Sequence, residues 1–330
     1  MIIDVGSNTI KNSIYESQPD GSVHETKSRS LLVQLIKYVH DGVLSEQGLE
    51  VLCESLTSFK EKADKFECTH IYCFATAALR RLNDPTQVFE QVRERTGIEI
   101  QLLSGDEEAE LSWLTLQARG EGKATTGLLI DIGGGSTELT KFTERTVTHR
   151  VSLPFGALSL YESHVAAGEH EFPNEKQKKA IRQTVADMIS AENLDGCGEN
   201  IYLLGGSTKA VGTLMRLMQE HDIKSLHKLS YKNNIRKTDA FRFNQVYTFQ
   251  RSQFKYVCGK FEKLSARKTK IFRNIFPRRY MLVMPAFAAL DVIFEAAGAE
   301  HIHVIPGGIR DGFICKLHDK ILNIVNPKSI

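Results

Sequence analysis

The sequence predicts an α/β protein made of two domains, and three observations support this. The chain has 330 residues, more than a single hydrophobic core usually accommodates. Apolar runs typical of strands alternate along it with segments of helical spacing. A strand followed by Asp-x-Gly and a polar turn occurs twice, at Asp4-Val5-Gly6-Ser7 and at Asp131-Ile132-Gly133-Gly134. An internal duplication of this size implies two similar domains.

The composition is that of an ordinary globular protein and excludes several other classes. Hydrophobic residues make up 42% and charged residues 25%, which excludes intrinsic disorder, collagen and coiled coil. No run of about 18 apolar residues would span a bilayer, since Met281–Phe294 is interrupted by Asp291. There is no signal-type apolar stretch at the N-terminus, and the six cysteines are scattered without a C-x-x-C pair. We therefore expect a cytoplasmic protein with reduced thiols, no zinc and no membrane association.

The first half is predicted to begin with a strand, Met1–Val5, whose polar turn leads into a return strand, Ile10–Glu16. Leucines and a phenylalanine recur at helical spacing after Ser45, which predicts a helix over Ser45–Phe66. The elements predicted next are, in order, a strand over Ile71–Ala75, a short helix over Thr76–Leu82, a helix opened by Pro85 and closed at Gly97, a strand over Ile98–Leu103 and a helix from Ser104 to about Gly120.

The second half repeats the opening pattern after a linker rich in Gly, Thr and charge, Gly120–Thr126. A strand over Gly127–Ile132 is followed by a glycine turn and a return strand over Thr137–Phe142. Two later strands, Ile201–Leu204 and Ile302–Ile305, also end in glycine turns.

The glycine turns predict phosphate binding. A glycine turn lets the backbone approach a ligand, successive N–H groups form an anion-binding nest, and a following helix adds its positive end. A single Asp-x-Gly is common turn chemistry, which is the structural alternative for any one copy. Neither a Walker A loop nor a G-x-G-x-x-G fingerprint is present. The candidate phosphate-binding residues are Gly6, Ser7, Asn8, Gly133, Gly134, Gly135, Ser136, Gly206, Ser207 and Thr208, and a fourth turn is Pro306-Gly307-Gly308.

Several charged residues beside these turns are candidates for chemistry. Asp131 at a strand end, with Glu138 on the return strand, suits a Mg²⁺ ion that bridges carboxylate and phosphate. Ser104 and Glu107 match a capping box, whereas Glu108 points about 100° round the helix. A carboxylate in a first helical turn is stabilised as the anion, which suits a base that orients water, although an exposed first-turn acid is the alternative.

Arg80 begins a short helix beyond a buried strand end. Its guanidinium has paired donors that can clamp phosphate oxygens.

The charge of the chain is unevenly distributed. Residues 224–279 carry sixteen Lys and Arg against two acids, a net charge of +14 within a chain whose total is +2. Aromatic residues are interleaved with these cations. The segment predicts a polyanionic partner, whereas solvated cations over an aromatic core are the structural alternative.

These motifs together resemble the exopolyphosphatase/guanosine pentaphosphate phosphohydrolase (Ppx/GppA) family. The resemblance runs in order along nearly the whole chain, from residue 3 to about 314. The resembling stretches are Ile3–Asn8, Ala75–Arg80, Leu103–Ala109, Ile130–Glu138, Ser152–Ala157, Gly205–Ala210 and Gly307–Gly312.

The resemblance implies two actin-like (ribonuclease H-like) domains with a cleft between them, over residues 1–120 and 121–312, with a C-terminal helix over about 313–330 that packs back on the first. It implies that Glu108 is the catalytic base, that Arg80 binds phosphate, and that Asp131 and Glu138 bind metal and water. Lys11 departs from the pattern, because a different residue is expected shortly after the first loop.

We therefore expect a phosphoanhydride hydrolase that releases terminal phosphate from inorganic polyphosphate, from the stringent-response nucleotide pppGpp, or from both. Mg²⁺ is the expected cofactor, with another divalent ion or an added monovalent ion as alternatives, and the protein is expected to be a monomer or a homodimer. The alternatives are hydrolysis of pppGpp only, a sensor that binds (p)ppGpp or polyphosphate without turnover, and an ATP-using kinase or ATPase of the same fold. Nucleic-acid binding by residues 224–279 is the weakest alternative.

Overall fold

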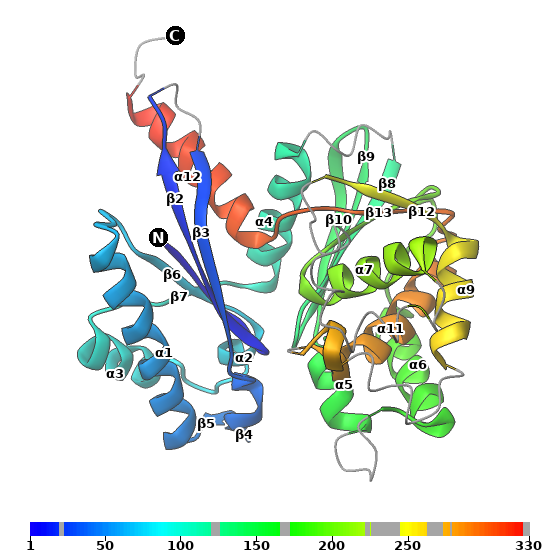
Figure 1. Cartoon of the computed structure of the whole chain (residues 1–330), viewed down its shortest axis with the longest axis horizontal. Helices are drawn as coiled ribbons and strands as arrows, with labels where there is room; N and C mark the ends of the chain where they lie inside the picture. Colours follow the sequence, from blue (N-terminus) through cyan, green and yellow to red (C-terminus); the bar gives the residue numbers. More distant parts are fainter. Residues whose placement is uncertain are drawn as a thin grey trace. The chain divides into compact units, whose positions relative to one another are not determined.

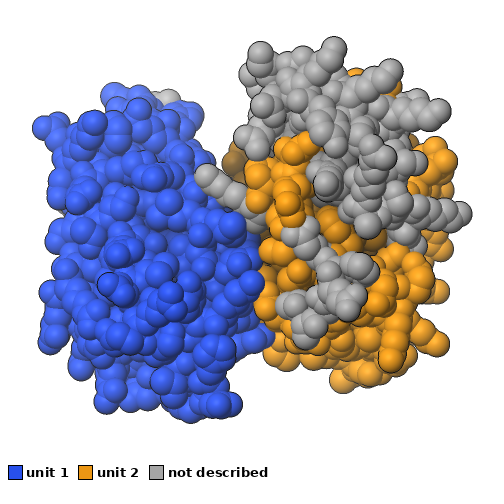
Figure 2. Space-filling model, turned by 60° about the horizontal axis from the view of Figure 1, so that its bottom comes forward, with its two compact units in different colours: residues 1–114, 309–330 blue, residues 115–308 orange. Residues whose placement is uncertain are grey.

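The chain forms two compact units, one of Met1–Leu114 with Ile309–Ile330 and the other of Thr115–Gly308. They are coloured separately in Figure 2. The sequence-based boundaries, 120/121 and 312/313, lie a few residues from these divisions. The computed structural model describes residues 1–19, 23–119, 126–165, 172–221, 225, 245–262, 273–277 and 279–325, with side chains in the last helix as far as 318.

The first unit is built on a five-stranded sheet in the order β3-β2-β1-β6-β7 (Figure 1). Its strands are β1 (Ile2–Val5), β2 (Thr9–Ser17), β3 (Val23–Leu32), β6 (Tyr72–Ala75) and β7 (Gln101–Leu102). β1, β6 and β7 are parallel, whereas β2 runs antiparallel to both β1 and β3. A short hairpin of β4 (Val39–His40) and β5 (Val43–Leu44) follows a 3₁₀ helix, η1 (Leu35–Tyr38).

Helices of the first unit start and end where local sequence signals place them. They are α1 (Glu46–Lys65), α2 (Ala77–Arg80), α3 (Thr86–Thr96), α4 (Gly105–Ala118) and α12 (Ile309–Val325). The side chain of Ser45 caps α1 by accepting the Gly48 amide at 3.2 Å, and the predicted apolar face of Leu49, Leu52, Leu56 and Phe59 is buried. Gly97 ends α3 in the left-handed conformation.

α12 returns to the first unit after the whole second unit. The Phe313 ring packs 5.3 Å from that of Phe74 on β6, within a core that includes Ile2 and Leu111. Gly312 lies directly against the carbonyl of Leu111 on α4, where a Cβ would collide with backbone. The absence of a side chain on Gly312 therefore allows the two helices to cross closely.

The second unit carries a six-stranded sheet in the order β10-β9-β8-β11-β13-β12. Its strands are β8 (Thr126–Ile132), β9 (Thr137–Thr143), β10 (Thr146–Leu153), β11 (Asn200–Leu204), β12 (Tyr247–Gln250) and β13 (His301–Val304). Its helical elements are α5 (Ala157–His164), α6 (Glu175–Ile189), α7 (Gly206–Glu220), α9 (Arg251–Glu262), η4 (Tyr280–Leu282) and α11 (Val283–Ala296).

Both sheets share one plan, which confirms the predicted α/β class and the duplication. In each, the second strand returns antiparallel to the first, the third pairs outside the second, and two later strands add parallel on the other side. Numbered along the chain within each unit, the strands therefore lie in the order 3-2-1-4-5, which is the order of a ribonuclease H-like domain. The second sheet adds β12 as an antiparallel edge.

The apolar stretch that contains Asp291 is α11, a buried helix that packs on α6. The Asp291 carboxylate forms an ion pair with Arg182 of α6, which explains how one acid is accommodated in this helix. Within the described part of the chain, no helix is long and apolar enough to cross a membrane.

The sequence overextended one strand and missed five, which are β3, β4, β5, β10 and β12. β3 is polar and mostly exposed and pairs only with β2, so its sequence lacks the alternation that marks a half-buried strand. The strand predicted over Ile98–Leu103 is only the two-residue β7, and Pro85 is the N-cap of α3 rather than its first residue. The linker predicted over Gly120–Thr126 lies outside the described residues, except for Thr126 at the start of β8.

Two helical glycines give opposite predictions for the same substitution. Gly312→Ala should lower the free energy of unfolding by about 1–3 kcal/mol, because its Cβ collides with the Leu111 carbonyl. Gly259→Ala in α9, where a Cβ would meet nothing within 4 Å, should raise it by about 0.5–1 kcal/mol through the better helix propensity of alanine. Denaturant unfolding followed by circular dichroism measures both changes, and equal shifts would contradict the close crossing of α4 and α12.

Candidate functional site

The first glycine loop joins β1 to β2 and presents buried polar side chains. The Gly6 amide donates to the Thr9 carbonyl at 3.2 Å and closes the turn. Ser7 and Asn8 are buried, and among the described residues the Ser7 hydroxyl and both polar atoms of the Asn8 amide have no hydrogen-bond partner. Because a buried polar group without a partner costs about 1–3 kcal/mol, such a loop is suited to a polar ligand.

The backbone of residues 33–36 binds the carbonyl groups of this loop. The backbone N–H groups of Val33 and Gln34 donate to the Asn8 carbonyl at 3.2 and 3.0 Å, and that of Ile36 donates to the Ser7 carbonyl at 3.3 Å. Gln34 takes the left-handed conformation, with φ of 55°. Sequence analysis did not single out this segment, because its contacts are made by backbone groups that leave no residue signature.

The second glycine loop, between β8 and β9, repeats the arrangement. Here the Gly133 amide donates to the Ser136 carbonyl at 2.9 Å. The first amides of α5 bind the carbonyl groups of this loop. Ala157 N–H donates to the Gly133 carbonyl and Leu158 N–H to the Gly134 carbonyl, each at 3.0 Å. In both units the loop carbonyls are therefore engaged by protein donors.

The third loop leads from β11 into α7, whose first residue is Gly206. Gly205 has φ of 91°, and a Cβ on it would collide with the Asp131 carboxylate. Ser207 is buried, and its hydroxyl has no hydrogen-bond partner among the described residues. The Thr208 hydroxyl instead donates to the Gly205 carbonyl at 3.0 Å and fixes the helix start. The loop thus combines a helix N-terminus with a buried hydroxyl.

Arg279 lies against this loop, and sequence analysis did not select it. A Cβ on Gly206 would lie 2.5 Å from Arg279 Cζ, so the guanidinium covers the first residue of α7. In the sequence Arg279 is only the last cation of residues 224–279. Its place depends on a contact between residues 73 positions apart, which no local pattern reports.

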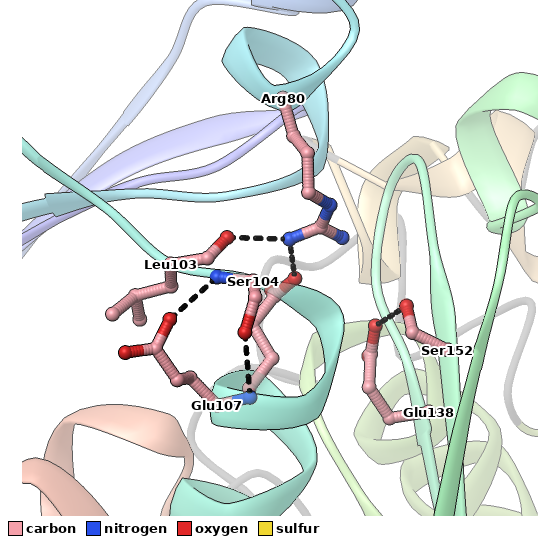
Figure 3. Close-up of polar contacts among 7 residues, drawn as sticks. Arg80, Leu103, Ser104, Glu107, Glu138 and Ser152 are labelled. Atoms are coloured by element: carbon pink, nitrogen blue, oxygen red, sulfur yellow. Dashed lines mark hydrogen bonds and ion pairs between the residues drawn. The ribbon is translucent and has the colours of Figure 1, made fainter.

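The two acids predicted to bind metal lie directly opposite each other. Asp131 on β8 pairs in register with Glu138 on β9, and the residues are 7% and 4% exposed. Glu138 accepts a hydrogen bond from the Ser152 hydroxyl of β10 at 2.9 Å (Figure 3). Two like charges opposed across buried strands are unfavourable, so this place suits a cation.

The donor set of this pair fits magnesium rather than zinc. Among the described residues no cluster of three or more His, Cys, Asp and Glu could hold a metal alone. Mg²⁺ is commonly bound by one or two carboxylates together with water and substrate phosphate. Asp131 and Glu138 fit that requirement.

Arg80 and Glu108, 28 residues apart, are brought together within the first unit. Arg80 Nη1 donates to Glu108 Oε2 at 2.6 Å and to the Leu103 carbonyl at 2.8 Å (Figure 3). Glu108 is 6% exposed, in the first turn of α4. An arginine in contact stabilises the ionised form of a buried carboxylate. Arg80 and Glu108 therefore form an ion pair at the first turn of α4.

The neighbouring acid, Glu107, has a structural role, as the sequence predicted. Its carboxylate accepts the Ser104 amide at 2.7 Å, and its amide donates to the Ser104 hydroxyl at 3.2 Å (Figure 3). This capping box starts α4 and orients it so that Glu108 faces Arg80.

The described part of residues 224–279 supports the structural alternative for its aromatic residues. Phe249, Phe254 and Phe261 are buried, and the Phe254 ring packs 4.9 Å from Phe294 of α11. Residues 226–244 and 263–272, which carry many of the cations, lie outside the described residues, so the track for a polyanion stays a prediction.

The reduced state of the six cysteines stays a prediction. None of them forms a disulfide in the described part of the chain, and Cys53, Cys73, Cys197 and Cys258 are buried. Burial, with the nearby Asp4 carboxylate, raises the pKa of the Cys73 thiol well above its usual range.

The chain is similar to known proteins both in sequence and in fold. The Exopolyphosphatase 1 of Mycobacterium tuberculosis is 29% identical over 157 residues, which are 47% of this chain and 46% of that protein. The chain thus matches about half the length of this curated relative. A crystal structure of the Aquifex aeolicus Ppx/GppA family member is 21% identical, with a TM-score of 0.73 over 97% of both chains. A crystal structure of an exopolyphosphatase from Cytophaga hutchinsonii gives a TM-score of 0.77 at 17% identity, again over 97% of both chains. These two structural likenesses establish the fold.

The family model of the Ppx/GppA phosphatase family matches residues 13–321. The matched range includes Arg80, Glu108, Asp131 and Glu138, and the glycine loops of the second unit. The chain belongs to the Ppx/GppA phosphatase family.

Proposed function

We propose that this protein is a cytoplasmic, Mg²⁺-dependent hydrolase that releases terminal phosphate from inorganic polyphosphate. The observation that carries the proposal is the set of buried, unpartnered polar groups of Ser7, Asn8 and Ser207 on two glycine loops. The serine hydroxyls and the amide N–H groups of Asn8 can donate hydrogen bonds to phosphoryl oxygens. The similarity to the mycobacterial Exopolyphosphatase 1 supports the same substrate.

In the proposed reaction, Glu108 takes a proton from a water whose oxygen attacks the terminal phosphorus. The bond between that phosphorus and its bridging oxygen breaks, and the bridging oxygen leaves on the shortened chain. Arg80 keeps Glu108 ionised, and its guanidinium directs donors at the phosphoryl oxygens. A Mg²⁺ ion held by Asp131 and Glu138 would neutralise charge on the phosphate. Positioning and electrostatic stabilisation supply most of the catalysis in such reactions.

Polyphosphate is favoured over pppGpp because of the cations of residues 224–279, with a net charge of +14. A long polyanion would use these cations beyond the reacting phosphate, and its binding would weaken steeply with salt, as phosphate-backbone binding does. Arg279, which lies against the third glycine loop, is one of these cations and supports this choice. Hydrolysis of pppGpp, with or without polyphosphate, is the alternative. Phosphate release from long-chain polyphosphate, pppGpp and ATP, with and without Mg²⁺, separates these activities from a sensor and from an ATPase.

Glu108→Gln should lower the rate of phosphate release by about 10²–10⁴-fold, because the amide cannot accept the proton of the attacking water. Glu107→Gln is the matched control, one residue away on the same helix. It affects the capping box and should change the free energy of unfolding by at most about 1 kcal/mol, with activity near that of the parent protein. Single-turnover phosphate release measures the activity of both variants. Parent-like activity in a folded Glu108→Gln protein would exclude Glu108 as the base.

Gly205→Ala should weaken divalent-ion binding, because its Cβ displaces the Asp131 carboxylate. Gly298→Ala is the control for backbone strain: Gly298 also has positive φ, 66°, but a Cβ there meets nothing within 4 Å. Gly298→Ala should cost about 1 kcal/mol of stability from its backbone conformation. Gly205→Ala should cost more, about 1–3 kcal/mol, because its φ of 91° and ψ of 172° are reached essentially by glycine alone. Only Gly205→Ala should raise the dissociation constant for Mn²⁺ measured by calorimetry. Equal Mn²⁺ affinities in the two variants would argue against a metal site at Asp131.

A further inference from the structure

The edge strand β10 brings a serine to the candidate metal site of the second unit. Ser152 of β10 lies opposite Glu138 of β9, and Glu138 in turn lies opposite Asp131 of β8. Side chains directly opposite each other on neighbouring antiparallel strands lie on the same face of the sheet. The three side chains therefore form one row, with Glu138 in the middle.

The two acids of this row are supported in different ways. Asp131 has a short side chain, and Gly205 is packed so closely against it that a Cβ on the glycine would lie 2.0 Å from Asp131 Oδ1. Glu138 has a longer side chain with more rotamer freedom to lose. From the strand on the other side of β9, the Ser152 hydroxyl donates a hydrogen bond to Glu138 Oε1 at 2.9 Å (Figure 3). Because Glu138 is buried, this bond faces little competition from water and fixes the direction of its carboxylate.

The backbone that carries Ser152 is itself tied to the second glycine loop. The Thr137 hydroxyl donates to the Phe155 carbonyl at 2.8 Å in the buried interior. Gly156 packs so closely on the loop that a Cβ on it would lie 2.5 Å from the carbonyl carbon of Gly134. α5 begins at the next residue, and its first amides bind the loop carbonyls. Ser152 is therefore held in place opposite β9.

We propose that Ser152 is a positioning residue that orients the Glu138 carboxylate for the divalent ion of the proposed function. The proposal rests on that metal site and adds a residue to it that touches neither the metal nor the substrate. Ser152 acts only through its hydrogen bond to Glu138. Removing a residue that orients a metal ligand in this way commonly lowers metal affinity by about 10–100-fold.

The dissociation constant for Mn²⁺, measured by calorimetry on the full chain, tests this role. Ser152→Val and Ser152→Thr are a matched pair, because the two side chains have nearly the same shape and only threonine has a hydroxyl. Ser152→Val should raise the dissociation constant by about 10–100-fold, whereas Ser152→Thr should leave it near that of the parent protein. Ser152→Ala, which removes the hydroxyl and adds no volume, should behave as Ser152→Val does.

Ser30→Ala is the control for position. Ser30 of β3 lies opposite Lys11 in the first unit, in the place that Ser152 has opposite Glu138 in the second. Its substitution should leave the Mn²⁺ affinity unchanged.

Asp131→Asn distinguishes a failure of this proposal from a failure of the metal site. If Asp131→Asn binds Mn²⁺ as tightly as the parent protein, the metal site of the proposed function is wrong, and the role of Ser152 is overturned with it. If Asp131→Asn loses Mn²⁺ binding but Ser152→Val and Ser152→Thr have equal affinities, only the role of the Ser152 hydroxyl is overturned.

Discussion

The candidate site depends on one hydrogen bond in each unit, in the turn between the first two strands. It runs from a glycine amide to the carbonyl three residues later. That bond, from Gly6 to Thr9 and from Gly133 to Ser136, determines the register of the return strand. Because side chains alternate along a strand, the register decides which residue lies beside the aspartate at the strand end. A shift of one residue would turn both Lys11 and Glu138 to the opposite face of the sheet.

The loops are also held so that they present donors rather than acceptors. In the first unit the backbone of residues 33–36 bonds to the loop carbonyls, and in the second the first amides of α5 do so. The same requirement is met by unrelated segments, one beginning with the left-handed residue Gln34 and the other a regular helix end. The buried hydroxyls and the Asn8 amide that lack partners among the described residues then carry a desolvation cost that a bound polar ligand can recover.

Acidic residues close together in sequence have different roles because of what packs against them. Glu107 and Glu108 are adjacent, but one bonds to Ser104 and starts the helix, while the other meets Arg80 from the end of a different helix. The rotation of about 100° per residue along a helix separates them. Likewise Lys11 and Glu138 occupy equivalent positions in the two sheets and have opposite charge, so one duplicated frame provides two electrostatic environments.

Much of the fold and of the candidate site followed from the sequence, because strand periodicity, glycine turns and capping residues are local signals. The duplication, the helix over α1, the capping box of Glu107 and the α/β class all rest on such signals and are confirmed. The ion pair of Arg80 with Glu108, the cover of Gly206 by Arg279 and the backbone bonds from residues 33–36 were decided only by tertiary structure. They join residues far apart in the chain, often through backbone groups common to every residue, so composition and spacing cannot report them. The register that places Lys11 opposite Asp4 depends on sequence and tertiary structure together. The turn sequence determines it, but only the strand pairing in the two sheets shows that Lys11 opposite Asp4 corresponds to Glu138 opposite Asp131.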